Sequence, residues 1–249
     1  MFDISIDEKY IVTQEGTSEG TQIKYKKDGY WYKLDSKGNE GLCEYLVSKL
    51  LTFSRLDENE FVLYEQGFIN GKKGCRSKDF IKNEDEELIT LYRLYHNETG
   101  HNLAEVLGKF DNVGKRIEYT VDFVKKSTGY DISDYFKKIF TLDRITLNDD
   151  RHVNNLALLG TNKGFKAAPV FDNGKSLLTA NVSYNKNFSM EENVKRVIAR
   201  PFSGSHQEMF DYFGEGFKLD KDNALKWLET EPASLERNVL IYQIKRYYE

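Results

Sequence analysis

The sequence is poor in cysteine and proline and contains no long apolar run. Its two cysteines, Cys43 and Cys75, stand in no CxxC or Cys/His pattern, which argues against a zinc site built on thiolates. No stretch approaches the roughly 18 apolar residues of a membrane span, and the N-terminal MFDISIDEKYIV lacks the apolar core of a signal peptide. These absences predict a cytoplasmic protein with reduced, buried thiols; export as an effector by another route is the alternative.

An excess of positive charge is also absent. The 249 residues include 36 Lys and Arg against 40 Asp and Glu, which gives a net charge of −4 with both signs interspersed. This balance argues against binding to nucleic acid or to an anionic membrane. Hydrophobic residues make up 39% of the chain and aromatic residues 14%, a composition typical of a globular protein that buries its own core.

The first third of the chain alternates short β-rich segments with one helix. TQIKYKK and YWYKLD flank an Asp-Gly pair, and FVLYEQGFING with KKGCRSKDF surrounds an Asn-Gly pair, so two hairpins are predicted. Between them, EGLCEYLVSKLLTF has the apolar spacing of an amphipathic helix that begins at Glu40.

The remainder is mainly helical. Helical spacing runs from Glu84 to Asn148, two short strands follow at 156–160 and 165–172, and helices return from Ser203. We therefore expect an α+β chain with two lobes. Their expected bounds are 1–78 for the small β-rich lobe with one helix and 79–249 for the larger helical lobe.

One run in the second lobe, LNDDRHVNNLALL, concentrates acidic and amide side chains just before a predicted hairpin. Asn155 follows Asp150 by five positions, and Asp172 ends the hairpin. Phosphoryl transfer needs a carboxylate to accept the proton of the attacking hydroxyl, and oxygen ligands for the magnesium ions that neutralise the triphosphate. The protein-kinase loop H-R-D-x-x-x-x-N has the same Asp-to-Asn interval, although the first three letters here read D-R-H. The pattern predicts a kinase site that uses ATP and Mg²⁺.

Simpler interpretations exist for the same residues. The run could be a solvated turn, and Asp172 in FDNGK could be an ordinary turn residue. His152 with Asp149 and Asp150 resembles part of a zinc hydrolase site, but zinc catalysis usually employs more than one histidine, and the other three stand singly. We expect Arg151 and His152 to brace the loop by hydrogen bonds.

A kinase also needs residues that hold the nucleotide. Lys33 lies in the aromatic strand YWYKLD, ahead of a helix in which Glu44 is the expected partner and Glu40 the second choice. The stretch EGTSEGTQIKY has the small and polar residues of a phosphate loop, without a Walker pattern. Taken singly, the loop could be a plain turn and the lysine could face solvent, but the order of the parts along the chain is that of a kinase. The candidate ATP contacts in this stretch are Thr17, Ser18, Gly20, Thr21 and Gln22.

LNDDRHVNNLALL together with APVFDNGKSLL resembles the catalytic core of HipA-type serine/threonine kinases, the toxin kinases of bacterial toxin–antitoxin systems, whose fold is related to the phosphoinositide kinases. GTQIK resembles the family's G-x-Q-x-K stretch, and NEGLCEYLVSKLL resembles the helix after its ATP-binding lysine. The likeness covers residues 17–178. It implies a bilobal, protein-kinase-like fold, Asp150 as catalytic base, Asn155 and Asp172 as magnesium ligands, and Lys33 on the ATP phosphates.

The resemblance also implies regulation and partners. Members of the family autophosphorylate a serine in or near the phosphate loop, a position that falls on Thr17 here, with Ser18 next to it. The chain is expected to be a short form without the family's extra N-terminal subdomain, so an antitoxin or companion subunit is a less certain partner than a protein substrate.

Three functions are open at this point. The first is a serine/threonine protein kinase. The second is a phosphoinositide-type lipid kinase, since D-R-H-x-x-N occurs there too, although only Lys175 and Lys186 follow Asp172 within the next dozen or so residues. The third is a catalytically inactive pseudokinase that binds nucleotide. No pattern in the sequence identifies the substrate.

Overall fold

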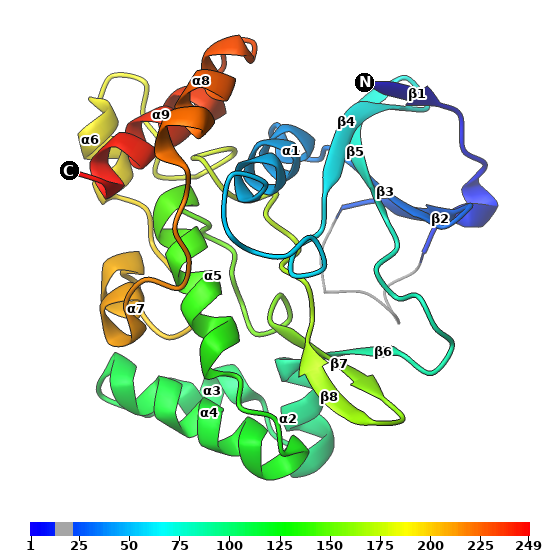
Figure 1. Ribbon diagram of the computed structural model, residues 1–249, viewed down its shortest axis with the longest axis vertical. Helices are drawn as coiled ribbons and strands as arrows, with labels where there is room; N and C mark the ends of the chain where they lie inside the picture. Colours follow the sequence, from blue (N-terminus) through cyan, green and yellow to red (C-terminus); the bar gives the residue numbers. More distant parts are fainter. Residues whose placement is uncertain (13–21) are drawn as a thin grey trace.

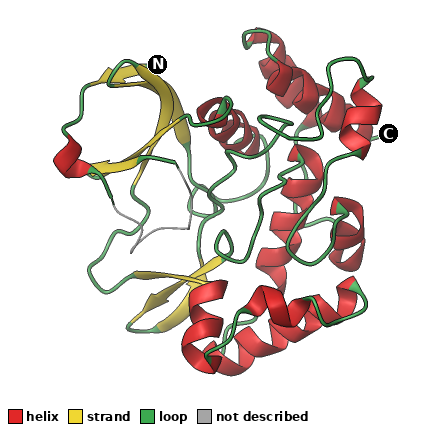
Figure 2. Cartoon of the chain, turned by 180° about the vertical axis from the view of Figure 1, so that it is seen from behind, coloured by secondary structure: helices red, strands yellow, loops and turns green. Residues whose placement is uncertain are grey.

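The computed structural model describes residues 1–12 and 22–249, and it places most strands on one side of the molecule and most helices on the other (Figures 1 and 2). One sheet has the strand order β1-β4-β5-β3-β2, and a second has the order β6-β7-β8. The strands are β1 (Phe2–Ile4), β2 (Lys24–Lys27), β3 (Tyr30–Leu34), β4 (Tyr64–Ile69), β5 (Lys72–Lys78), β6 (Glu87–Thr90), β7 (Ala157–Thr161) and β8 (Gly164–Ala167). The helices are α1 (Glu40–Leu51), α2 (Leu91–Thr99), α3 (Leu103–Leu107), α4 (Val113–Thr128), α5 (Ser133–Thr146), α6 (Met190–Lys195), α7 (His206–Phe213), α8 (Lys221–Thr230) and α9 (Leu235–Tyr247), with a 3-10 turn, η1 (Glu8–Tyr10).

Both predicted hairpins are present in the five-stranded sheet. Asp28 and Gly29 join β2 to β3, and Asn70 and Gly71 join β4 to β5; all four residues have φ between 50° and 75°. Two-residue turns of this kind need positive φ at both positions, which Asn, Asp and Gly tolerate best. The register places Lys24 directly opposite Lys33 on the neighbouring strand. Strand β1, which pairs in parallel with β4, was not expected from the sequence.

Helix α1 joins the sheet to the helices. Its apolar residues Leu46, Val47 and Leu50 are fully buried and belong to the largest hydrophobic cluster, which continues into α5. The N-terminal turn of α1 approaches β5 so closely that a Cβ on Gly41 would lie 2.7 Å from the backbone carbon of Gly74. This glycine contact brings the following turn of α1, with Glu44, against the sheet.

The structure corrects three expectations about the second lobe. Strand β8 ends at Ala167, five residues before Asp172, where the second strand of the hairpin was expected to end. Residues 87–90 form β6 instead of the first turn of a helix, because Leu88 and Ile89 pair with β7 about 70 residues later, a contact that local spacing does not reveal. The helix then starts at Leu91, capped by Thr90. Helix α6 begins before Ser203, where helices were expected to return, and is preceded by a Ser189 capping box.

Among the described residues, no helix is both long and apolar enough to cross a membrane. Both cysteines are buried and neither forms a disulfide.

Candidate functional site

Lys33 lies between two carboxylates contributed by distant parts of the chain. Its Nζ donates to Glu44 Oε1 of α1 at 2.6 Å and to Asp172 Oδ1 at 3.0 Å, and it lies 3.5 Å from the hydroxyl of Tyr64. Lys33 and Glu44 are buried, and the Asp172 side chain is 21% exposed. The backbone N–H of Asn173 donates to the other oxygen of Glu44 at 2.8 Å. The strand lysine, the helix glutamate and the segment after β8 therefore meet at one point.

The charges of this cluster favour a protonated lysine. Burial by itself lowers the pKa of Lys33, but the carboxylates of Asp172 and Glu44 outweigh burial and raise this pKa well above its usual value. Lys24, which faces the same cluster from β2, is also buried, and burial lowers its pKa, against the attraction of Asp172. The two lysines and the carboxylates of Glu44 and Asp172 balance in formal charge, so the cluster as a whole carries no excess of either sign.

The predicted catalytic loop follows α5 and is folded on itself. Helix α5 ends at Thr146, and Leu147 adopts a left-handed conformation with φ of 57°. Asn148 Oδ1 then accepts from the N–H of Asp150 at 3.0 Å, and the carbonyl of Asp150 accepts from Asn155 Nδ2 at 2.9 Å. These bonds close the interval between Asp150 and Asn155 and leave the Asp150 side chain half-buried.

The side chain of Asn155 has an acceptor oxygen that the surrounding loop does not use. Its side chain is 4% exposed, its Nδ2 is used within the loop, and its Oδ1 has no partner among the described residues. A buried oxygen without a partner costs about 1–3 kcal/mol, so such atoms usually serve a purpose. An amide oxygen together with the Asp172 carboxylate is a donor set that suits Mg²⁺. The residues present therefore fit a magnesium ion held jointly with phosphate oxygens.

A fully buried arginine connects the loop to the segment around Asp172. Arg151 donates to both carboxylate oxygens of Asp143 at 3.0–3.3 Å, to the carbonyl of Phe171 at 2.8 Å and to Asn173 Oδ1 at 2.6 Å. Asn148 Nδ2 adds a 3.4 Å contact to the carbonyl of Asp172. Asp172 itself has φ of 61°, a conformation that a non-glycine residue holds only where its surroundings enforce it.

His152 bonds within its own loop. Its N–H donates to the carbonyl of Asp150 at 2.8 Å, and its Nδ1 accepts from the N–H of Asn154 at 3.2 Å. Among the described residues, no three His, Cys, Asp or Glu side chains gather in a way that could hold a metal ion, so the zinc hydrolase interpretation finds no support.

Glu40 does not pair with Lys33. Its carboxylate accepts from the N–H groups of Ser36, Lys37 and Gly38 and from the Ser36 hydroxyl, all within 3.2 Å. It thereby orders the turn before α1. Gln22 is half-buried just ahead of β2, whereas Thr17, Ser18, Gly20 and Thr21 lie outside the described residues.

Comparisons with known proteins agree with this architecture at the level of the fold. No family model matches the sequence, and a search of curated proteins finds no match. Among solved structures, the chain is similar to the proinflammatory kinase CtkA of Helicobacter pylori, with a TM-score of 0.66 and 16% identity over 99% of this chain and 94% of that chain. The chain shares the fold of this kinase. The predicted α+β, bilobal, kinase-like fold is therefore confirmed.

A HipA from Shewanella oneidensis MR-1, solved with HipB and operator DNA, matches with a TM-score of 0.49 and 10% identity over 98% of this chain and 66% of that chain. The fold shared with CtkA is consistent with the HipA-type resemblance seen in the motifs.

Several residues of this region were not identified from the sequence. Lys24 could have been, since a predicted hairpin places it opposite Lys33 and cross-strand neighbours share a face. Asp143, the partner of Arg151, lies within α5, and from the sequence alone it would be expected on the solvent-facing side of an amphipathic helix. His206, whose Nε2 lies 2.8 Å from the carbonyl of Asn148, comes from a helix 58 residues away and has no local signal.

Proposed function

We propose that this chain is an ATP- and Mg²⁺-dependent, HipA-like kinase that phosphorylates serine or threonine side chains of proteins. The observation that carries the proposal is the convergence of Lys33, Glu44 and Asp172 beside a loop in which a buried oxygen of Asn155 has no partner among the described residues. Each of these side chains has a task in phosphoryl transfer, and together they occur in the order along the chain that a kinase requires.

In this proposal the β-rich part, residues 1–78, holds the nucleotide. Lys33, kept in place by Glu44, binds the ATP phosphates, and Lys24 adds a second positive charge. Asn155 and Asp172 would hold Mg²⁺, which supplies charge neutralisation at the phosphates. Thr17, Ser18, Gly20, Thr21 and Gln22 are the proposed contacts of the phosphate loop.

Asp150 is the proposed catalytic base in the second part, residues 79–249. The acceptor oxygen forms a bond to the γ-phosphorus, the bond from that phosphorus to the β,γ-bridging oxygen breaks, and the acceptor proton passes to the Asp150 carboxylate. Arg151 and Asn148 position this carboxylate through the loop backbone and touch no reacting atom. Orientation of the hydroxyl and of the phosphate supplies most of the rate in such a mechanism.

The test is transfer of label from γ-labelled ATP by the Asp150→Ala protein. We expect incorporation into the chain itself and into a generic protein substrate to fall at least about a hundredfold, within the range usual for loss of a general base. A shift in melting temperature with Mg-ATP should persist. Asp122→Asn on the exposed face of α4 is the matched control and should retain full activity. Undiminished labelling by the Asp150→Ala protein would refute the assignment.

The same experiment separates the rival functions. Labelled phosphoinositide vesicles with no labelled protein would indicate a lipid kinase, and an ATP-induced thermal shift without turnover would indicate a pseudokinase. Mass spectrometry after incubation with Mg-ATP tests the proposed autophosphorylation, for which Thr17 and Ser18 are the expected positions. An antitoxin or companion subunit remains a prediction from the motif resemblance, which co-purification from the source cell would test.

A further inference from the structure

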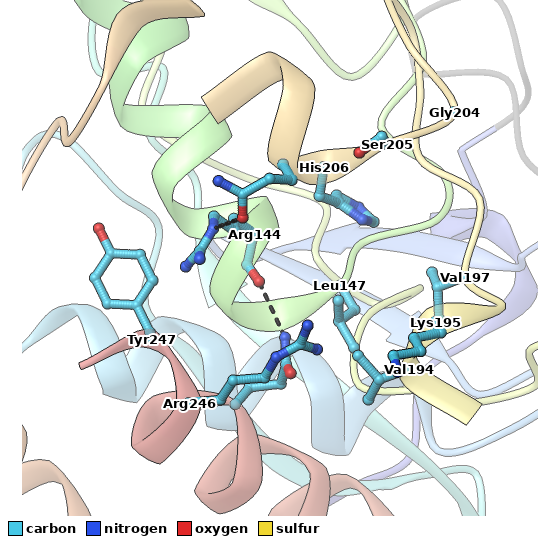
Figure 3. A pocket seen from close by; sticks show the side chains of 12 residues that line it. Arg144, Leu147, Val194, Lys195, Val197, Gly204, Ser205, His206, Arg246 and Tyr247 are labelled. Atoms are coloured by element: carbon cyan, nitrogen blue, oxygen red, sulfur yellow. Dashed lines mark hydrogen bonds between the residues drawn. The ribbon is translucent and has the colours of Figure 1, made fainter. Parts of the chain in front are cut away.

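A cavity with a positively charged lining lies on a different part of the molecule from the proposed ATP site. Its volume is about 220 Å³, and its walls come from the end of α5, from α6 and the segment after it, from the start of α7 and from α9 (Figure 3). None of Lys33, Glu44, Asp150, Asn155 and Asp172 lines it. Figure 3 shows Arg144, Lys195 and Arg246 contributed by three separate helices around this space.

The lining has three cations and, among the described residues, no carboxylate. Each cation stands in the last turn of its helix, where the helix dipole favours positive charge. That dipole amounts to roughly half a charge per helix end, so it offsets only part of three full charges. Glu191 pairs with Lys195 at 2.6 Å but does not line the cavity. A net positive space remains in a chain whose total charge is −4.

Arg144 shows that the cations affect one another. Its Nε donates to Gln207 Oε1 at 2.6 Å, and its guanidinium lies over the rings of Phe210 and Tyr247 at 4.9 and 4.8 Å. Burial lowers the pKa of Arg144 and the positive charge of Arg246 lowers it further, while Tyr247 and the Asp211 carboxylate oppose this shift. Two arginines that repel across a small cavity would be relieved by an anion between them.

Hydrogen-bonding groups complete the walls. Helix α7 begins at the cavity with Ser205 as N-cap. Ser205 Oγ accepts from the N–H of Glu208 at 3.3 Å, and the N–H groups of His206 and Gln207 have no partner inside the helix. Gln243 is 95% buried; its Nε2 donates to the carbonyl of Arg144 at 3.1 Å, and its Oε1 has no partner among the described residues. The cavity thus offers cations and the N–H groups at the start of α7 for anionic oxygens.

We propose that this cavity binds a phosphate group. A hydrogen phosphate has several anionic oxygens for the arginines and the helix amides. The volume accommodates a phosphate group together with several waters. The group could be free phosphate or the phosphorylated side chain of a peptide, which present the same chemistry.

The experiment is calorimetric titration of the complete protein, at constant ionic strength and without ATP. The probes are inorganic phosphate and a capped glycine-phosphoserine-glycine peptide, each compared with chloride or with the unphosphorylated peptide. We expect saturable binding of at least one phosphate probe, with the stronger binder identifying the source. Arg246→Gln should weaken it about tenfold, the usual effect of losing one charge-assisted hydrogen bond. Lys195→Gln should weaken it in the same direction.

Two control variants show whether the binding belongs to this cavity. Lys245→Gln removes the same charge one residue away on α9, outside the cavity, and should change affinity by less than about twofold. Phosphate binding that is lost in Lys33→Met but kept in Arg246→Gln would place it at the proposed nucleotide site and would overturn the proposal. No saturable binding of either probe up to about 10 mM would overturn the proposal, and so would equal losses in Arg246→Gln and Lys245→Gln. Because no turnover is measured, the result stands whether or not the chain proves to be a kinase.

Discussion

Replacing Arg151 by methionine is the most direct test of how the loop around Asp150 is held. The side chains of Arg151 and of its main partner, Asp143, are both fully buried. Arg151 Nη2 lies 3.0 Å from Asp143 Oδ1. Methionine preserves most of the length and the apolar stem but removes the charge and every N–H donor. Asp143 then remains in the interior as an uncompensated carboxylate, and the Phe171 carbonyl loses its donor.

The expected cost follows from this geometry. Removing one member of a buried ion pair typically destabilises a protein by about 3–5 kcal/mol. Total stabilities lie at about 5–15 kcal/mol, so a large part of the stability of this chain would be lost. For a domain of this size the melting temperature should fall by roughly 6–20 °C. Arg151→Lys should fall between the wild type and Arg151→Met, because an ammonium keeps the charge but cannot bond Asp143 with two parallel N–H groups.

The assay is urea unfolding followed by the fluorescence of the two tryptophans, for Arg151→Met, Asp143→Leu and the double variant. We expect each single change to cost more than the double change, which leaves no charge buried without its partner. Single variants that lose less than about 1 kcal/mol, or losses that simply add in the double variant, would refute the reasoning.

Three further predictions concern α1 and its surroundings. Burial raises the pKa of Glu40, but the N–H and hydroxyl donors of the preceding turn outweigh burial and lower the pKa to about 2. The ionised carboxylate therefore stabilises the fold above pH 4.5, and this stabilisation is lost as the pH falls toward 2. Glu40→Gln should therefore lower the free energy of unfolding by about 2 kcal/mol at pH 7, as measured by urea titration. The difference from wild type should shrink between pH 5 and pH 2, and a difference that does not change with pH would contradict the prediction. Gly41→Ala should lower the free energy of unfolding by about 1–3 kcal/mol, since the new Cβ would lie 2.7 Å from the backbone of β5. In the same measurement Gly204→Ala, whose Cβ would have its nearest neighbour at 3.6 Å, should change the free energy by less than about 0.5 kcal/mol. Glu44→Gln should lower the rate of label transfer from ATP at least tenfold without unfolding the chain, because Lys33 loses its carboxylate partner at 2.6 Å. An unchanged rate would show that the Lys33–Glu44 pair has no role in transfer.

Local chemistry explains what the sequence could predict. The Asp-Gly and Asn-Gly turns require positive φ at adjacent positions, and few other residue pairs satisfy that requirement. The helix that begins at Glu40 could be predicted from the spacing of its apolar residues, because nearly all of them face one core. The pairing of Lys33 with Glu44 was predicted because a kinase holds its strand lysine with a glutamate of the following helix.

Partners remote in sequence explain what the sequence could not predict. The pairing of β6 with β7 decides that residues 87–90 are extended, and the helical spacing of ELITLYRL conceals it. Arg151 was predicted to brace the loop, but its partner could not be predicted. Asp143 lies inside α5, and the apolar spacing of that helix gives no sign that this carboxylate is buried. Strand β1 has only three residues and acquires its structure from β4, which lies some 60 residues later in the chain.

The burial of both thiols has a practical consequence for studying motion in this chain. Cys43 lies on α1 with its Sγ 3.2 Å from the carbonyl of Ser176, Cys75 lies on β5 opposite Lys33, and burial raises the pKa of each thiol well above its usual value. Thiolate is the species that reacts with maleimides, so dyes should leave both native cysteines unmodified while the protein is folded. New cysteines at exposed positions, such as Lys73 on β5 and Lys126 on α4, would then take fluorophores without any background substitution. The energy transfer between such a pair would report opening and closing of the molecule as nucleotide is added.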